Sequence, residues 1–237
     1  MKKMLVSDYD DTLYINDEKI QKNLEAIENF RKKGNLFVIA TGRSYYDFQV
    51  KRDKYNIKFD YLILNHGATI IKNDKIIFNQ IIEKEIVTKI KNELRLLDNY
   101  SLFCCSAKES RVRIDHDNIT KIHVAFNDKK NAKQAKEILD EKYGNEINTY
   151  YISAKTALEI ISKKTNKAVA INEIVKQEKI EKNNIYVIGN GSSDIEMIKK
   201  FNGYAVKNAI PEVLKISKES YQSVEQLVEE VLDETNN

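Results

Sequence analysis

The sequence predicts an α/β fold in which a Rossmann-like, doubly wound parallel sheet forms the core and a smaller α+β domain is inserted into it. Three observations support this prediction. Short apolar runs alternate with helical patterns at both ends of the chain, as they do when helices cross over between parallel strands. The middle of the chain breaks that alternation. Glycine and proline are scarce, 7 and 1 among 237 residues, so each is expected where the backbone requires it.

The N-terminal part contains three short apolar runs with the character of buried strands. A helix separates the first two, because the apolar residues from 20 to 30 recur at helical spacing and Gly34 follows as a C-cap. A second helix is expected from about 44 to 55. The alternating order indicates a parallel sheet with crossover helices. The expected strands lie at 4–6, 36–40 and 61–64.

The pattern changes after the third strand. Residues 68–80 predict a hairpin that turns at Asn73-Asp74. Two helical stripes, from 86 to 97 and from 129 to 142, are then interleaved with strand-like segments. Such a mixture is typical of a small α+β unit. The strand-like segments lie at 102–105, 111–115, 121–126 and 148–152.

Alternation of strands and helices resumes near the C-terminal end. We therefore assign residues 1–79 and 152–237 to the core and residues 80–151 to the inserted domain. The last helix is amphipathic, and Ser223 with Gln226 forms a candidate capping box at its start. The expected strands are 158–161, 185–188 and 204–206, and the expected helices are 168–175, one from near 194, one from Pro211 and 224–232.

Composition and charge exclude several classes of protein. Lys and Arg number 39 against 36 Asp and Glu, a net charge of +3, so a strongly basic nucleic-acid binder is not expected. No apolar run reaches the roughly 18–20 residues that span a bilayer, and Asp8 comes too early for a signal peptide. We expect a cytoplasmic protein with no membrane or nucleic-acid partner. Cys104 and Cys105 are interpreted as buried strand thiols rather than as a disulfide or a metal site.

Polar residues gather where the predicted parallel strands end. In an open parallel sheet, ligands bind beyond the carboxyl ends of the strands. Carboxylates, hydroxyl groups and four of the seven glycines lie there. This combination predicts a site for a divalent cation and a phosphate group, although each segment alone also fits a polar turn or a helix cap. The segments are Asp8-Tyr9-Asp10-Asp11-Thr12, Thr41-Gly42-Arg43, Asn65-His66-Gly67 and Gly189-Asn190-Gly191-Ser192-Ser193-Asp194.

The residue types in these segments suit phosphoryl transfer. Asp8 can attack phosphorus, and Asp10 can protonate the leaving oxygen and then activate water. Thr41 offers a hydroxyl group beside the flexible backbone of Gly42 for the phosphate oxygens. Lys167 lies at a predicted helix N-terminus, where a cation is unfavourable with the helix dipole, and this placement suggests a function. Mg²⁺ is the expected cofactor because it prefers oxygen ligands.

These segments resemble the motifs of the haloacid dehalogenase (HAD) superfamily, and within it the Cof-type phosphatases with a type IIB cap. The resemblance rests on residues 8–13, 40–43 and 189–197, on Lys167 and on the stretch 207–212, and it covers nearly the whole chain. It implies that the inserted domain is a cap that closes over a small phosphorylated metabolite such as a sugar phosphate. The implied activity is Mg²⁺-dependent hydrolysis of a phosphoric monoester through an aspartyl-phosphate.

The resemblance also implies a role for each matching residue. Asp8 would be the nucleophile and a metal ligand. Asp10 would be the general acid and base, with its backbone carbonyl on the metal. The remaining implied roles are phosphate binding by Thr41, Gly42 and Lys167, and metal binding by Asp194 and Asn190.

Four positions depart from the family pattern. One is Ser193, which stands before Asp194 where the family usually has an asparagine. Asn190 stands where the family has a metal-binding aspartate, and a unit charge pair at 4 Å is worth roughly 4 kcal/mol at an effective dielectric constant of ~20. We therefore expect weaker Mg²⁺ binding rather than its loss. Asp11 replaces a common glycine, which we expect to be tolerated. His66 replaces a frequent asparagine and either lines the site or is structural.

Other functions stay open at this point. A phosphomutase or phosphotransferase of the same superfamily would pass the phosphoryl group to a sugar. A non-catalytic metabolite-binding protein would keep the fold with a weakened metal site. A phospho-accepting receiver domain is shorter, and its phosphorylated aspartate follows a later strand, so the exit at Asn65-His66-Gly67 argues against it. The sequence leaves the oligomeric state open.

Overall fold

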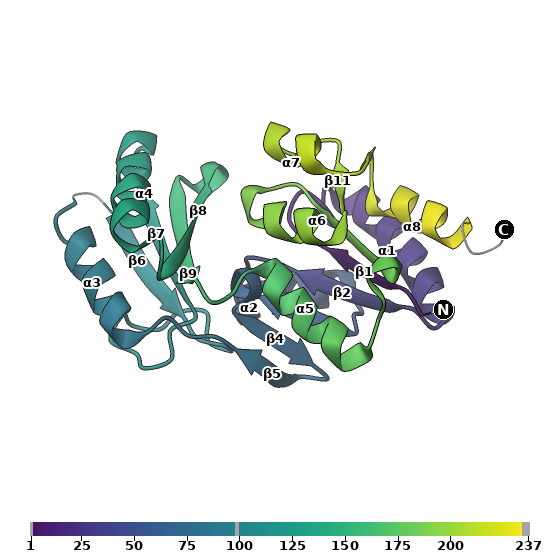
Figure 1. The fold of residues 1–237 in the computed structure, drawn as a ribbon, viewed down its shortest axis with the longest axis horizontal. Coiled ribbons are helices and arrows are strands. Elements are labelled where there is room, and N and C mark those ends of the chain that lie inside the picture. The colour runs from purple at the N-terminus through teal and green to yellow at the C-terminus, as the bar shows by residue number, and fades with distance from the viewer. Residues whose placement is uncertain (1, 98–99, 234–237) are drawn as a thin grey trace.

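The computed structural model describes residues 2–97 and 100–233, which form two sheets. The larger sheet has eight strands in the order β12-β11-β10-β1-β2-β3-β4-β5, and the smaller has four in the order β6-β7-β9-β8. Figure 1 shows the two sheets in separate halves of the molecule, with both termini at the far end of the larger half. The chain therefore consists of a core and an inserted unit, which is the arrangement that the alternation of elements predicts.

Six strands of the larger sheet are parallel, and a hairpin extends it at one edge. The chain runs from β1 outward through β2 and β3, and later returns to the other side of β1 with β10. This reversal places the switch point of the sheet between β1 and β10, where ligands bind in doubly wound folds. The parallel strands are β1 (Met4–Ser7), β2 (Leu36–Ala40), β3 (Tyr61–Leu64), β10 (Ile185–Gly189), β11 (Tyr204–Val206) and β12 (Ser220–Tyr221), and the hairpin is β4 (Thr69–Lys72) with β5 (Lys75–Asn79).

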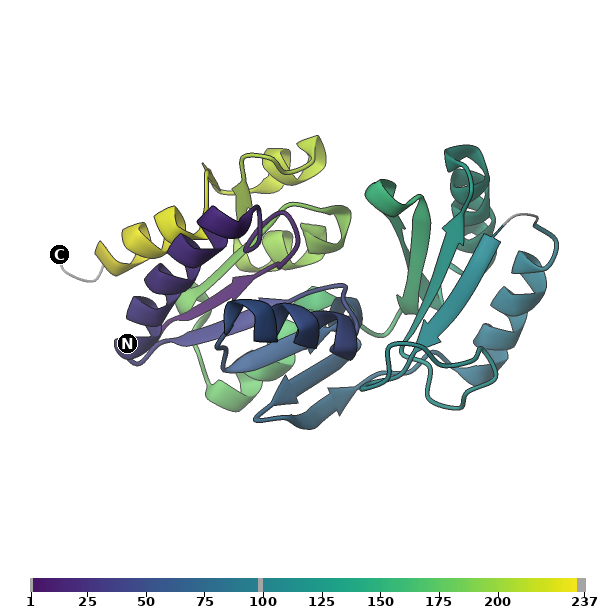
Figure 2. The same cartoon turned by 180° about the vertical axis from the view of Figure 1, so that it is seen from behind.

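Helices cover both faces of the larger sheet. Helices α1, α2 and α8 face the viewer in Figure 2, and α5 and α6 face the viewer in Figure 1. Asn16 caps the first helix by accepting a hydrogen bond from the backbone of Lys19 at 2.8 Å, and Gly34, with φ +84°, follows its end. The helices are α1 (Asp17–Lys32), α2 (Tyr45–Tyr55), α5 (Lys167–Glu178), α6 (Ile195–Phe201), α7 (Pro211–Ile216) and α8 (Val224–Asp233).

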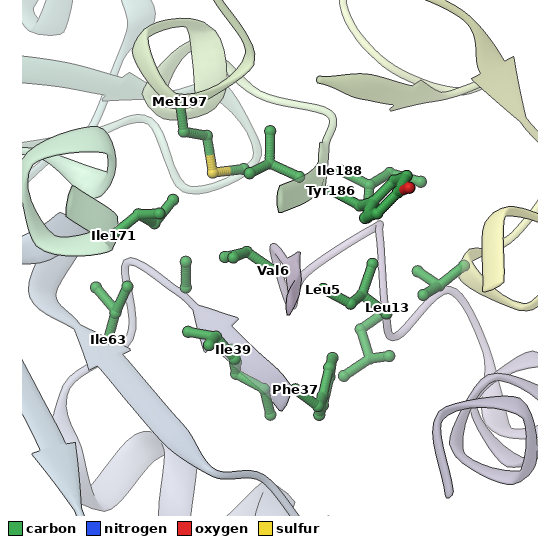
Figure 3. Close-up of a cluster of buried hydrophobic side chains, with 14 of the residues drawn as sticks. Leu5, Val6, Leu13, Phe37, Ile39, Ile63, Ile171, Tyr186, Ile188 and Met197 are labelled. Atoms are coloured by element: carbon green, nitrogen blue, oxygen red, sulfur yellow. The ribbon is translucent and has the colours of Figure 1, made fainter. Parts of the chain in front are cut away.

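The main hydrophobic core lies between the larger sheet and these helices. Figure 3 shows side chains of the central strands, among them Val6, Ile39 and Ile63, together with Ile171 from α5 and Met197 from α6. All are buried. Burial of each such side chain contributes about 1.5–3 kcal/mol, and together these contacts hold the carboxyl ends of the strands in fixed positions.

The smaller sheet is antiparallel and is covered by helices on one face only. Ile122 and Val124 of β7 pack into a second hydrophobic cluster with α3 and α4, which Figure 1 shows on the side away from the core. Because side chains alternate along a strand, Lys121 and His123 lie on the opposite face. The elements are α3 (Lys84–Leu94), β6 (Tyr100–Cys105), β7 (Lys121–Phe126), α4 (Lys129–Tyr143), β8 (Ile147–Ile152) and β9 (Ala157–Ser162).

Two expectations about this region are wrong. We expected the strand at 158–161 to belong to the core, but β9 pairs with β7 and β8 of the smaller sheet. The short turn between β8 and β9, at Ser153–Lys155, leaves room only for an antiparallel hairpin. The segment 111–115 forms no strand, and its only strand-like contact is a bridge between Val112 and Cys104. Strand β12 did not appear among the expected elements.

Two other sequence interpretations are tested by the structure. Cys104 and Cys105 are buried, free thiols in β6, as expected. The capping box before α8 is half formed, since the Gln226 backbone donates to Ser223 Oγ at 3.4 Å, whereas the Gln226 side chain accepts from Gln222. In the described part of the chain, no helix has the length and apolar character that crossing a membrane requires.

Candidate active site

The first strand delivers Asp8 to the carboxyl edge of the sheet. The Asp8 backbone N–H donates to the carbonyl of Ile188 in β10 at 2.9 Å, and its carbonyl accepts from Ser7 Oγ at 2.7 Å. A turn then brings Leu13 N–H back to the same carbonyl at 3.2 Å. Within this turn Asp11 has φ +57°, a left-handed conformation that glycine adopts most readily and that aspartate tolerates better than most residues. The Asp8 backbone is therefore fixed on both sides.

Three predicted site residues meet in one buried cluster. Lys167 Nζ lies 2.6 Å from Asp8 Oδ1 and 2.6 Å from Asp194 Oδ1. The side chains of Lys167 and Asp194 are each 1% exposed and that of Asp8 is 9% exposed. These residues come from α5, from the end of β1 and from the turn before α6, so the fold joins segments 159 residues apart in sequence.

The charges in this cluster are not balanced. Burial raises the pKa of Asp8 from its ordinary 3.8 to about 7, Lys167 opposes this rise, and Asp194 adds to it. Although burial alone would lower the pKa of Lys167, the two carboxylates raise it, so the ammonium keeps its proton. One buried cation thus faces two carboxyl groups, and a further cation would relieve the excess negative charge.

A close backbone approach positions Lys167. Asn166 caps α5 by accepting a hydrogen bond from Val169 N–H at 2.9 Å. Gly67, with φ +107°, lies so near that a Cβ added there would be 2.3 Å from the carbonyl carbon of Asn166. Thr165 Oγ1 also donates to the Gly67 carbonyl at 2.7 Å. The loop after β3 therefore sets the start of α5, and only a glycine fits there.

Asp194 is held by the loop that follows β10. Its Oδ2 accepts from the backbone N–H groups of Asn190 and Gly191, each at 2.9 Å. A Cβ added at Gly189 would lie 2.5 Å from Asp194 Cγ, so this glycine admits the carboxylate. The Asn190 side chain has a different contact, because its Oδ1 accepts from Thr12 Oγ1 at 3.3 Å. Asn190 thus joins the cluster through its backbone, and its amide oxygen faces the turn after β1.

The other predicted residues lie around this cluster rather than in it. Thr41 is buried, and its Oγ1 accepts from the N–H of Arg43 at 3.1 Å. The carboxylate of Asp10 is paired with Arg43 and is not hydrogen-bonded to the Asp8 cluster. The carbonyl of Gly42 accepts from Lys121 Nζ of the smaller domain at 2.5 Å. The structure therefore places these residues at the predicted edge but gives two of them partners that the sequence did not indicate.

Three residues of the smaller sheet that face the core were not predicted as site residues, and they contact His66, which was expected either to line the site or to be structural. Glu159 Oε1 accepts from Lys121 at 3.0 Å and from His123 at 3.1 Å, and its Oε2 lies 2.5 Å from His66 Nε2. Burial alone would raise the pKa of Glu159, but these three partners hold it well below its ordinary value. One feature of the sequence could have indicated this network. Glu159 lies in the apolar run Leu158-Glu159-Ile160-Ile161, and a carboxylate that is buried in such a run needs hydrogen-bond partners.

The donor set at the edge of the sheet fits a hard cation. Asp8 and Asp194 supply two carboxylates in one buried place with excess negative charge. Within residues 2–97 and 100–233, no group of three or more His, Cys, Asp or Glu side chains forms a metal site. A bound Mg²⁺ would therefore take its remaining ligands from neutral oxygens and water, as Mg²⁺ commonly does.

A doubly wound core with a buried aspartate at the end of its central strand, and an inserted unit beside that strand end, is the architecture of a class of capped hydrolases. The sequence profile of the haloacid dehalogenase-like hydrolases matches residues 5–112 and 104–228. The chain belongs to the haloacid dehalogenase-like hydrolase family. The predicted family and fold class are therefore confirmed.

Individual relatives agree with this assignment. A protein named "Putative phosphatase" from Buchnera aphidicola subsp. Schizaphis graminum is 27% identical over 224 residues, which cover 83% of this chain and 81% of the relative. A haloacid dehalogenase-like hydrolase from Bacteroides thetaiotaomicron has the same fold, with a TM-score of 0.79 at 19% identity over 98% of this chain and 100% of that one. A HAD subclass IIB sugar phosphatase has a TM-score of 0.80 at 15% identity, over 97% and 98%.

Proposed function

We propose that the protein is a Mg²⁺-dependent phosphatase that hydrolyses a small phosphorylated metabolite. The observation that carries this proposal is the buried cluster of Asp8, Lys167 and Asp194 at the switch point of the sheet. A carboxylate next to a fixed ammonium group can receive a phosphoryl group, whose negative charge the ammonium stabilises. The "Putative phosphatase" from Buchnera supports the same reaction class.

The proposed reaction has two steps. In the first, Asp8 Oδ attacks phosphorus, the bond from phosphorus to the ester oxygen breaks, and Asp10 gives a proton to that oxygen. In the second, Asp10 takes a proton from water, the water oxygen attacks phosphorus, and the bond from phosphorus to Asp8 Oδ breaks, which releases inorganic phosphate and restores the Asp8 carboxylate. Thr41, the backbone of Gly42 and Lys167 bind the phosphoryl oxygens. The pair with Arg43 holds Asp10 at this edge of the sheet, and one of the two Asp10 oxygens must turn from Arg43 toward the leaving group in the first step.

The proposed ligands of Mg²⁺ are Asp8, Asp194, the backbone carbonyl of Asp10 and the amide oxygen of Asn190. The ion supplies positive charge that balances the two carboxylates and the phosphate. Asn190 contributes no charge, and its amide oxygen is engaged with Thr12 Oγ1 at 3.3 Å. We therefore propose weaker Mg²⁺ binding than an aspartate at this position would give.

The substrate is proposed to be a small molecule held between the core and the smaller domain. Lys121, His123 and Glu159 of the smaller sheet face the core and are buried against it. The smaller sheet therefore covers the carboxyl edge, which favours a small substrate over a large polymer. The subclass IIB sugar phosphatase with the same fold supports a sugar phosphate or a related compound.

A phosphate-release screen tests the proposed function. The full-length protein is incubated with a panel of phosphorylated sugars, polyols and p-nitrophenyl phosphate while Mg²⁺ is raised to saturation. We expect hydrolysis that requires Mg²⁺, that Asp8→Asn abolishes, and that the matched variant Asp11→Asn retains. Absence of turnover over the whole panel would overturn the proposal, and binding of esters without turnover would favour a metabolite-binding protein instead. Turnover that depends on an added sugar acceptor would indicate a phosphotransferase.

A further inference from the structure

The imidazole ring of His66 is buried between the core and the smaller domain. His66 follows β3 and is 3% exposed. One face of the ring lies against Gly42, where an added Cβ would be 2.2 Å from His66 Cε1. On the side of the smaller domain, the ring of Tyr150 in β8 lies with its centroid 4.7 Å away. The ring therefore has a fixed place beside the predicted phosphate-binding loop.

One nitrogen of this ring is bound to the smaller domain. His66 Nε2 lies 2.5 Å from Glu159 Oε2. The other carboxylate oxygen already accepts from Lys121 and His123. A carboxylate that stays ionised can only accept hydrogen bonds, so Nε2 of His66 carries the hydrogen of this pair. Burial lowers the pKa of His66, although Glu159 opposes this. This direction favours the neutral ring, in which Nδ1 has a free electron pair when Nε2 carries the hydrogen.

The second nitrogen is unpaired. Among the residues that the structure describes, Nδ1 of His66 has no hydrogen-bond partner although it is buried. Buried polar atoms without a partner are rare in native proteins and call for an explanation. The ring lies against Gly42, and the next residue, Gly67, is so close to α5 that a Cβ added there would be 2.8 Å from the backbone nitrogen of Lys167, so the ring lies beside the elements that carry the Asp8 cluster.

A row of side chains on the smaller sheet leads to this position. Phe103 pairs with His123, His123 with Glu159 and Glu159 with Tyr150, so that the row crosses all four strands. It lies on the face opposite the two helices of the smaller domain, because Ile122 and Val124 pack with those helices. The row therefore faces the core and provides an aromatic ring, Tyr150, beside His66.

We propose that Nδ1 of His66 accepts a hydrogen bond from a hydroxyl group of the substrate's organic part, and that Glu159 is a positioning residue that fixes the required tautomer. This proposal rests on the proposed phosphatase function. According to this proposal, His66 of the core selects phosphate esters that carry hydroxyl groups. Glu159 of the smaller domain determines which nitrogen of His66 carries the hydrogen. An ester without hydroxyl groups leaves the buried acceptor unpaired and is discriminated against.

Kinetics on matched esters provide the first test. The pairs are glycerol 3-phosphate with propyl phosphate, and ribose 5-phosphate with 2-deoxyribose 5-phosphate. We expect the wild type to prefer the hydroxylated member of at least one pair tenfold or more in kcat/KM. His66→Phe should remove this preference, whereas His66→Asn, which keeps an acceptor, should retain part of it. A preference that survives in His66→Phe overturns the proposal.

A second measurement does not depend on turnover. The chain has 3 histidines, so ¹⁵N NMR of the imidazole nitrogens is simple, and the His66 signals are those that disappear in His66→Phe but remain in His116→Phe. We expect the Nε2–H tautomer in the wild type and a mixture of tautomers in Glu159→Gln. In the Asp8→Asn protein, ribose 5-phosphate should shift the Nδ1 signal and propyl phosphate should not.

The NMR outcomes separate the two proposals. A proton on Nδ1 of free His66, or no shift with any hydroxylated ester, overturns the role of His66 even if the enzyme is active. An Nδ1 shift in a protein that hydrolyses nothing would support His66 as a ligand-binding residue and would overturn only the phosphatase reaction.

Discussion

Arg43 binds the carboxylate of Asp10 with two nitrogen atoms, Nη2 at 2.6 Å from Oδ1 and Nε at 2.9 Å from Oδ2. A bidentate pair of this kind fixes the orientation of the carboxylate. Arg43 belongs to the loop after β2 and Asp10 to the turn after β1. The proposed acid and the phosphate-binding loop are therefore connected in the structure through this ion pair.

The first prediction concerns Asp10. We expect Asp10→Asn to lower kcat for propyl phosphate by about 10²–10⁴-fold, the usual contribution of a general acid and base. The loss should be much smaller when the formation of the aspartyl-phosphate from p-nitrophenyl phosphate is measured, because p-nitrophenolate leaves without a proton. Pre-steady-state release of p-nitrophenol measures this step. Equal losses with the two esters would mean that Asp10 does not protonate the leaving group.

A related prediction compares kcat of two arginine variants, Arg43→Lys and Arg52→Lys. Arg43→Lys keeps the charge but loses the paired geometry, and we expect a loss of roughly tenfold in kcat because Asp10 is less well oriented. Arg52→Lys is the matched control, since Arg52 forms its ion pairs on the surface. A loss of the same size in both variants would show a general effect on stability.

The second prediction concerns the affinity for Mg²⁺. Asn190→Asp adds a negative charge at the proposed metal site, and we expect the Mg²⁺ concentration for half-maximal activity to fall tenfold or more. Calorimetric titration of Mg²⁺ into the substrate-free protein should show the same change. The control is Asn183→Asp, at an exposed position. Unchanged affinity in Asn190→Asp would exclude position 190 from the metal site.

The third prediction is a pH dependence of the metal-free protein. The pKa of Asp8 is about 7 in the folded state and near its ordinary 3.8 in the unfolded state. Between these values the folded state keeps a proton that the unfolded state has lost, so the Asp8 contribution to the free energy of unfolding falls as pH rises from about 4 to 7. Asp8→Asn should remove this contribution and be more stable than the wild type at pH 7.

Urea unfolding at pH 5, 6 and 7 without Mg²⁺ checks this prediction. The difference between the wild type and Asp8→Asn isolates Asp8 from groups such as His66, whose lowered pKa has the opposite effect in this range. Asp11→Asn serves as the control for loss of a carboxylate nearby. A difference that does not change with pH would show that Asp8 is already ionised throughout.

The fourth prediction compares two glycines with positive φ. Gly67 has φ +107° and touches the start of α5, whereas Gly34 has φ +84° and nothing within 4 Å of an added Cβ. Replacement of either by alanine strains the backbone by roughly 1–2 kcal/mol. Only Gly67→Ala should also displace Lys167, with a further loss of stability and at least tenfold lower activity. Urea unfolding and phosphate release measure both effects, and equal behaviour of the two variants would contradict the close approach.

Much of the core could be predicted because its signals are local. Short apolar runs end at polar segments, and parallel topology places those ends together. This reasoning brought Asp8 and Asp194 to one edge, whereas Lys167 was singled out by its place at a helix N-terminus and by the family resemblance. The structure joins Lys167 to each carboxylate at 2.6 Å. The ion pair of Asp10 with Arg43 was not predicted, since it depends on side-chain directions in two loops that sequence spacing does not determine.

The smaller domain was harder because its pattern is set by pairing between distant strands. Whether β9 belongs to the core or to the smaller sheet depends on its partners β7 and β8, and an apolar run fits either place. The same pairing brings Glu159 opposite His123 and Tyr150. The network around Glu159 therefore follows from the strand order. In the sequence, only the position of Glu159 in an apolar run indicated it.

The chain returns from the smaller domain to the core along a very short path. Strand β9 ends at Ser162 and α5 begins at Lys167, with residues 163–166 between them. Asn148 of β8 donates to the carbonyl of Thr165 in this link at 2.9 Å. A link of four residues allows little movement of β9 relative to α5. Any displacement of the smaller domain relative to the core would therefore be transmitted to the first turn of α5, which carries Lys167.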